Sequence, residues 1–240
     1  MIKFKFILIG EGTVGKTSLI SQFINNQFID DYIMTVGTDK SIKEIDINHK
    51  KITLEIWDTP GQADYNIVNK IFMKNTDIAL IVYDITNRKT FDKIGHWIKL
   101  VKEINENRNL IIGITANKSD LYENAEVTND EAKEYMNTIK DVTDLYFESS
   151  ASDHENVEIV FNELTKVYID KYGLKEKKID EKETTTIKNN STNNGNNTQM
   201  NFEMIQTNYN NNSNEEEEAN DIYYVIEKDD KCCSSKCIII

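Results

Sequence analysis

Several residue types are scarce in this chain of 240 residues, and each scarcity excludes a class of protein. The only three cysteines lie within the last nine residues, so the rest of the chain cannot form the disulfide framework of a small secreted domain. No apolar run approaches the roughly 20 residues that a membrane-spanning helix needs. Basic residues number 28 against 41 acidic ones, and a net charge of −13 argues against nucleic acid as a partner because phosphates would be repelled. The first residues, Met1–Lys5, have no signal-peptide pattern, so we expect a domain of the reducing cytosol.

Composition divides the chain into two parts. From Asn189 to Asn214, 12 of 26 residues are asparagine, and four consecutive glutamates follow at 215–218. Such a segment buries too little apolar surface to offset the entropy lost on ordering. We therefore expect a globular domain over residues 1–174 and a disordered tail over 175–240. The alternative to disorder within the tail is that Ile222–Ile226 is a segment that binds a partner.

Short apolar runs alternate with helical patterns in the first 174 residues. Three runs predict buried strands, and a period-two pattern on either side of Asn48–Lys50 predicts a hairpin. Apolar residues at helical spacing predict helices after the first run, from Ile94 to Ile104 and from Val157 to Val167. Strands that alternate with helices indicate an α/β fold, a mostly parallel sheet with helices on both faces. Ligands of such sheets bind at the carboxyl ends of the strands. The three runs are Phe4–Ile9, Ile78–Tyr83 and Leu110–Thr115.

The first predicted strand ends in Gly10-Glu11-Gly12-Thr13-Val14-Gly15-Lys16-Thr17, which fits the phosphate-binding pattern G-x-x-x-x-G-K-[ST]. Glycines allow successive backbone N–H groups to face one anion, and the following helix adds its positive N-terminal end. Lys16 supplies a charge to the outer phosphates, and the Thr17 hydroxyl is a ligand suited to Mg²⁺. Gly10, Gly12 and Gly15 also fit the dinucleotide pattern G-x-G-x-x-G, and a glycine turn without a ligand is a further alternative. The Lys16-Thr17 pair favours the phosphate loop.

Two further motifs follow predicted strands. Asn117-Lys118-Ser119-Asp120 has the form N-K-x-D, and the carboxylate of Asp120 suits two N–H donors of guanine that adenine lacks. A site built on that bond rejects the wrong base because its carboxylate would be left unpaired. Asp58-Thr59-Pro60-Gly61 has the form D-x-x-G, in which Asp58 suits Mg²⁺ through water and the Gly61 N–H suits a γ-phosphate. An ATPase or kinase with a phosphate loop is the competing interpretation, and Asp120 argues against it.

With these motifs, the chain resembles a small GTPase of the Ras superfamily over roughly residues 3–172. Tyr83-Asp84-Ile85-Thr86 and Glu148-Ser149-Ser150-Ala151 add two more motifs of that superfamily. It is most similar to Rab GTPases. This similarity rests on Trp57-Asp58-Thr59, on the stretch Tyr83-Asp84-Ile85-Thr86 and on Phe91 followed by Trp97. The resemblance implies a P-loop GTPase fold with a six-stranded, mostly parallel sheet, Mg²⁺ as cofactor, GTP and GDP as ligands, and a monomer that regulates vesicle traffic.

The resemblance also implies residue roles. Phe28 would contact the guanine edge-on, Thr35 would ligate Mg²⁺ in the GTP state, and Gln62 would orient the attacking water. The implied catalytic residues are Lys16, Thr35, Gly61 and Gln62, and the implied magnesium ligands are Thr17, Thr35 and Asp58. The implied GTP-binding residues are Gly10, Glu11, Gly12, Thr13, Val14, Gly15, Lys16, Thr17, Ser18, Phe28, Tyr32, Thr35, Asp58, Gly61, Asn117, Lys118, Asp120, Ser150 and Ala151.

Some residues depart from the Rab pattern. Pro60 and Ala63 stand where Rab proteins usually have alanine and glutamate, and Lys40 replaces a phenylalanine that effectors pack against. Residues 32–40 and 61–75 would be switches that bind GEF, GAP, GDI-type and effector proteins. Hydrolysis would be slow, because no arginine lies in a phosphate motif. The alternative function is a nucleotide-binding interaction module with little hydrolysis.

The chain ends in Cys237-Ile238-Ile239-Ile240, which fits the C-a-a-X pattern for prenylation. One lipid chain binds a membrane only marginally, so Cys232 or Cys233 would carry a palmitoyl group as the second anchor. We therefore expect the protein on the cytoplasmic face of a plasma membrane or vesicle, cycling with the cytosol.

Overall fold

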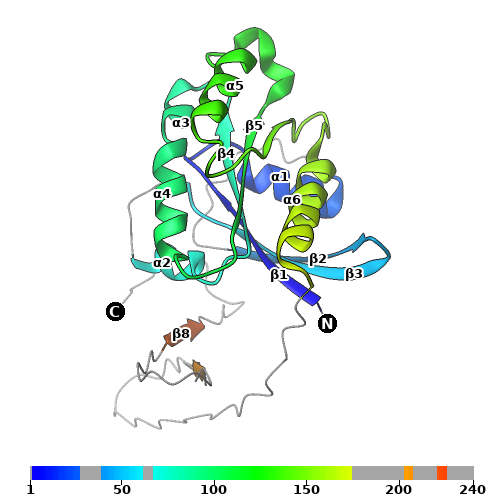
Figure 1. The fold of residues 1–240 in the computed structure, drawn as a ribbon, viewed down its shortest axis with the longest axis vertical. Helices are drawn as coiled ribbons and strands as arrows, with labels where there is room; N and C mark the ends of the chain where they lie inside the picture. The colour runs from blue at the N-terminus through cyan, green and yellow to red at the C-terminus, as the bar shows by residue number, and fades with distance from the viewer. Residues whose placement is uncertain (1, 28–38, 62–66, 175–202, 208–220, 226–240) are drawn as a thin grey trace, which may run out of the picture. The chain divides into compact units, whose positions relative to one another are not determined.

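The computed structural model describes residues 2–27, 39–61, 67–174, 203–207 and 221–225, and Figure 1 shows how their elements are arranged. The chain divides into two units, Met1–Lys177 and Lys178–Ile240, and each is described by itself. In the described helices, none is long and apolar enough to cross a membrane.

Six strands form the sheet of the first unit, in the order β2-β3-β1-β4-β5-β6. All neighbouring pairs are parallel except β2 and β3, which form the predicted hairpin. Its turn contains Asn48 and His49 with φ of 51° and 62°, the left-handed backbone that a tight hairpin turn requires. The strands are β1 (Ile2–Ile9), β2 (Asp39–Ile47), β3 (Lys50–Asp58), β4 (Ile78–Asp84), β5 (Ile111–Asn117) and β6 (Tyr146–Ser149).

Helices cover both faces of this sheet (Figure 1). One face packs against α1 (Lys16–Asn25) and α6 (Val157–Tyr172), and the other against α2 (Ile67–Met73), α3 (Arg88–Asp92), α4 (Ile94–Ile104) and α5 (Asn129–Thr138). A 3₁₀ helix, η1 (Ser119–Asn124), follows β5.

Strand β1 shows why the sequence pattern produces two cores. Phe4, Phe6 and Leu8 enter the core beneath α1 and α6, whereas Ile7 and Ile9 enter the other, because successive side chains of a strand point to opposite faces. A strand buried on both faces is uniformly apolar, as the sequence pattern predicted. The predicted fold class, a six-stranded, mostly parallel sheet between two helical layers, is confirmed.

In the second unit the structure describes two short strands, β7 (Glu203–Thr207) and β8 (Asp221–Val225), which pair antiparallel. The asparagine-rich composition predicted no strands there. Both segments contain residues of high strand propensity, such as Ile205, Ile222 and Val225. A two-stranded pair of this length is only marginally stable by itself in water.

Candidate functional site

The carboxyl ends of the parallel strands carry every motif that the sequence analysis singled out and that the structure describes. The phosphate loop follows β1, the D-x-x-G segment follows β3, and the N-K-x-D segment follows β5. Because parallel strands end at the same edge of the sheet, these motifs meet there although they are far apart in the sequence.

Glycines are required in the phosphate loop by close backbone approaches. Gly10 has φ of 145°, and a Cβ there would lie 2.3 Å from the carbonyl oxygen of Val82. Gly15 has φ of 93°, and a Cβ there would lie 2.3 Å from Nδ2 of Asn117. The loop therefore packs directly against β4 and the base motif, and a side chain at either position would push it away.

Gly61 connects the phosphate loop to the D-x-x-G segment. A Cβ at Gly61 would lie 2.4 Å from the backbone oxygen of Glu11 and 2.5 Å from Cα of Gly12. The Gly61 backbone is thus held against the predicted phosphate loop, as a contact of its N–H with a γ-phosphate would require.

Lys16 is almost completely buried beneath the loop, with 5% of its surface exposed. Its ammonium donates to the backbone oxygens of Gly10 at 2.9 Å and Glu11 at 2.8 Å. Burial lowers the pKa of Lys16 to about 8, although the nearby charges of Asp58 and Glu11 raise it. A phosphate group at this position would supply the negative charge that favours the protonated amine.

Thr17 and Asp58 form the oxygen pair expected of a magnesium site. The Thr17 hydroxyl donates to Oδ2 of Asp58 at 2.6 Å, and the hydroxyl of Thr59 donates to the backbone oxygen of Leu8 at 2.7 Å, which fixes the segment on β1. Mg²⁺ prefers oxygen ligands and keeps several waters, so this hydroxyl and carboxylate fit that ion.

Asn117 joins the base motif to the phosphate loop. Its side chain is 1% exposed, and Nδ2 donates to the backbone oxygen of Val14 at 2.7 Å. Oδ1 accepts from the Ser149 hydroxyl at 3.4 Å, and the hydroxyls of Ser149 and Thr115 are 2.8 Å apart. Three strand ends are therefore connected by one buried network, which holds the base end and the phosphate end in a fixed relation.

Asp120 and Lys118 are positioned by residues from other strands. The Ser150 hydroxyl donates to Oδ1 of Asp120 at 2.6 Å, leaving the carboxylate oriented by the segment after β6. The Lys118 ammonium pairs with Oδ2 of Asp84 at 2.5 Å, and its backbone is left-handed with φ of 65°. The sequence analysis assigned no role to Asp84, Ser149 or Thr115. For Asp84, the only signal in the sequence was the motif that contains it.

Comparison with known proteins agrees with this arrangement. The chain matches the Ras family over residues 5–170. It is 38% identical over 166 residues to Ras-related protein Rab-11A of Dictyostelium discoideum, covering 69% of this chain and 76% of the relative. It is 35% identical over 168 residues to GTP-binding protein ypt3 of Schizosaccharomyces pombe, covering 69% and 76%. It is 34% identical over 167 residues to human Ras-related protein Rab-21, covering 70% and 72%.

The chain belongs to the Rab family of Ras-superfamily GTPases. It is accordingly a GTPase that binds GTP and GDP, and its family works with regulators and effectors. The similarity covers the first structural unit, and the tail lies outside the family match.

The structure describes some of the other residues predicted for this Rab-family site, and the rest lie outside the described residues. Val14 and Ala151 are buried, and they support the phosphate loop and the segment after β6. Glu11 and Ser18 are half-buried. Thr13 is exposed and has a left-handed φ of 64°. Phe28, Tyr32, Thr35, Gln62, Ala63, Cys232, Cys233 and Cys237 lie outside the described residues.

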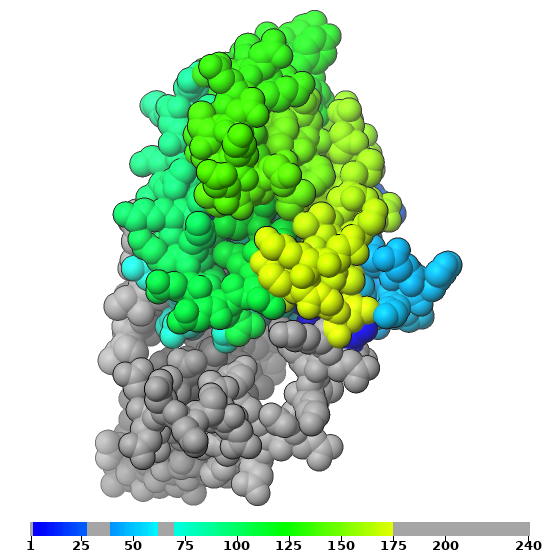
Figure 2. Space-filling view, viewed as in Figure 1, coloured from blue at the N-terminus to red at the C-terminus, as the bar shows by residue number. Residues whose placement is uncertain are grey.

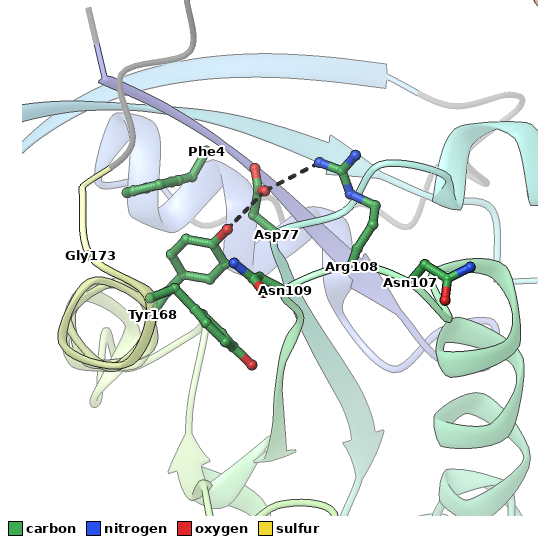
Figure 3. A pocket seen from close by; sticks show the side chains of 8 residues that line it. Phe4, Asp77, Asn107, Arg108, Asn109, Tyr168 and Gly173 are labelled. Carbon is green, nitrogen blue, oxygen red and sulfur yellow. Dashed lines mark hydrogen bonds and ion pairs between the residues drawn. The ribbon is translucent and has the colours of Figure 1, made fainter. Parts of the chain in front are cut away.

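A cavity of about 320 Å³ lies at the opposite end of the sheet from the nucleotide motifs. Figure 3 shows Tyr168 and Arg108 both directed at Asp77. The Tyr168 hydroxyl donates to Oδ1 of Asp77 at 3.2 Å, and Nη2 of Arg108 lies 3.8 Å from the same oxygen. These polar groups contact one another where the residue before β4 meets α6. Arg108 is therefore far from the phosphate loop and does not serve it as an arginine finger.

Proposed function

We propose that this Rab-family protein switches between GDP-bound and GTP-bound states at the cytoplasmic face of a membrane and regulates vesicle traffic. The single observation that carries the proposal is the connection between the two ends of the site. Asn117 links the base motif to Val14 of the phosphate loop, while Thr17 and Asp58 pair at the phosphate end. The nucleotide domain comprises residues 1–174, and residues 175–240 form its tail.

Each residue of the site has a proposed role. Lys16 and the loop amides from Gly10 to Ser18 hold the phosphates. Thr17, Thr35 and Asp58 would hold Mg²⁺, which would supply further positive charge there. Asn117, Lys118, Asp120, Ser150 and Ala151, with Phe28 and Tyr32, hold the guanosine.

Hydrolysis follows from the same arrangement. Gln62 orients a water whose oxygen bonds to the γ-phosphorus as the bond from phosphorus to the β–γ bridging oxygen breaks, giving GDP and inorganic phosphate. Lys16 and the Gly61 N–H stabilise the charge that develops on the phosphate oxygens.

The Asp120 carboxylate, oriented by Ser150 at 2.6 Å, selects guanine, so denatured protein should release GDP or GTP and no adenine nucleotide. Release of ADP or ATP would contradict the base assignment.

Hydrolysis by the isolated protein is expected to be slow. The chain has two arginines, Arg88 and Arg108. Both lie outside the phosphate loop, so a GAP in trans should accelerate the reaction by roughly 10³–10⁵. A single-turnover assay should give a half-time of tens of minutes or longer, with Gln62→Leu as the slower control. Equal rates for the two proteins would favour the alternative, an interaction module with little hydrolysis that Pro60 and Ala63 make conceivable.

The tail provides the proposed membrane anchor. A prenyl group on Cys237 and a palmitoyl group on Cys232 or Cys233 together give the two signals that stable anchoring needs. Cys237→Ser should move the protein from the membrane fraction to the soluble fraction of cells, and unchanged fractionation would contradict the anchor. A GDI-type partner would return the lipidated monomer to the cytosol, and a GEF, a GAP and effectors would bind residues 32–40 and 61–75.

A further inference from the structure

A buried glutamine of α1 is hydrogen-bonded to a histidine of the segment that follows β6. Gln22 is 3% exposed, and its Nε2 bonds to Nδ1 of His154. Helix α1 begins at Lys16 of the phosphate loop, whereas His154 follows Ser150 and Ala151 in the chain. The bond therefore joins the helix behind the phosphate end of the site to the segment at its base end.

The segment Ser150–Asn156 is a loop closed by its own hydrogen bonds. The Ser150 N–H donates to the backbone oxygen of Glu155 at 3.1 Å, and the Asp153 N–H donates to the Ser150 hydroxyl at 3.0 Å. His154 has a left-handed backbone with φ of 62°. These bonds fix the internal shape of the loop around Ser150, and the His154 side chain attaches the loop to α1.

Apolar contacts hold α1 against α6 but leave the loop at the surface. Phe23 of α1 stacks on Phe161 of α6 with ring centroids 4.0 Å apart, and the two helices lie side by side in Figure 1. Residues 152–155 are exposed, and Figure 2 shows the yellow-green segment before α6 on the surface of the first unit. Because an exposed loop has few packed contacts to restrain it, a bond to a buried side chain is a large part of its restraint.

The bond can form with either orientation of the Gln22 amide. With Nε2 toward the ring, the amide donates and Nδ1 of His154 accepts; with the amide turned over, an Nδ1–H donates to Oε1. Oε1 is buried and has no hydrogen-bond partner in the described part of the chain. Removal of the imidazole would therefore leave the buried amide without its partner, which costs more than the loss of a solvated bond.

We propose that Gln22 and His154 are positioning residues for the guanine base. Their bond fixes the loop Ser150–Asn156 on α1, so that Ser150 and Ala151 stay where they hold the guanosine. The inference rests on the proposed function, because that function assigns Ser150 and Ala151 to the guanosine. Both residues act through the loop, so breaking their bond lets the loop move away from the base and speeds nucleotide release.

The rate of GDP release measures this positioning. Full-length protein is loaded with fluorescent GDP and mixed with excess unlabelled GDP, and the fluorescence decay gives the dissociation rate constant. His154→Ala removes the ring, and Gln22→Met removes the amide while keeping a side chain of similar length. Each change should accelerate release about three- to tenfold, the range that the net contribution of one hydrogen bond allows.

Three further variants separate the bond from other effects. In His154→Asn the amide places a polar atom where Nδ1 stands, and asparagine tolerates a left-handed backbone, so release should stay within about twofold of wild type. His49 is an exposed histidine with the same φ of 62° in the turn between β2 and β3, so His49→Ala is the matched control and should leave release unchanged. The double variant of Gln22→Met and His154→Ala should release GDP no faster than the faster single variant, because both changes break the same bond.

Unchanged release from His154→Ala would overturn the inference, as would additive acceleration in the double variant or an asparagine variant as fast as the alanine one. Thermal unfolding checks that each variant folds, and if Gln22→Met does not, the histidine variants decide. Nucleotide content is measured on the same samples. A wild-type chain without guanine nucleotide overturns the proposed function and this inference with it. A wild-type chain that holds GDP, with variants that release it at the same rate, contradicts this inference alone.

Discussion

The burial of Lys16 has a consequence for the dependence of stability on pH. Its pKa is about 8 in the folded protein, lowered by burial from 10.5. Between these two values the unfolded chain binds more protons than the folded one, so the free energy of unfolding rises as pH increases through about 8. From pH 7 to 8.5 the rise should be about 1 kcal/mol, obtained from the change in protonation of this single group.

Nucleotide affinity should change in the opposite direction. Phosphate binding needs the protonated amine, whose population falls from roughly nine-tenths at pH 7 to roughly a quarter at pH 8.5, so the GDP dissociation constant should increase about fourfold. The upper limit of pH 8.5 keeps guanine itself largely protonated at N1.

Two assays test this reasoning. Urea unfolding of the nucleotide-free protein, prepared with a chelator, gives the stability at each pH, and fluorescent GDP displacement gives the affinity. Lys16→Met removes the titrating group, so its free energy of unfolding should not show this rise with pH. Dividing the GDP affinity of the wild type by that of Lys16→Met at each pH removes the effect of the ligand's own ionisation. A parallel rise in wild type and Lys16→Met, or an affinity ratio that does not change with pH, would refute the reasoning.

Three substitutions test the contacts that build the site and the core beneath it. Asn117→Ala removes the bond to the phosphate loop and leaves a buried carbonyl unpaired, so GDP affinity, measured by calorimetry, should fall by about 1–3 kcal/mol; an unchanged affinity would contradict the linking role. Ser150→Ala removes the donor that orients Asp120 at 2.6 Å and should raise the GDP dissociation rate several-fold in a stopped-flow chase, with thermal stability as the control for misfolding. Gly113→Ala would place a Cβ 2.6 Å from Leu164 in the core, so chemical unfolding should show a loss of about 1–3 kcal/mol while guanine selectivity stays the same.

Local patterns in the sequence were sufficient for the fold and for the placement of the motifs. The apolar runs of β1, β4 and β5 and the helical spacing in α4 and α6 are short-range signals, and each became the predicted element. The paired strands β7 and β8 were not predicted, because the composition of their surroundings outweighed the strand propensity of a few residues.

Sequence by itself determined which residues form the phosphate loop, the D-x-x-G segment and the guanine motif, because each depends on residue types at fixed short spacing. Tertiary structure decided how these motifs are joined and what surrounds them. The bond from Asn117 to Val14 spans 103 residues, and Lys118 is held by Asp84 of another strand. No local pattern contains such contacts, since only the order and register of the strands bring these side chains within bonding distance.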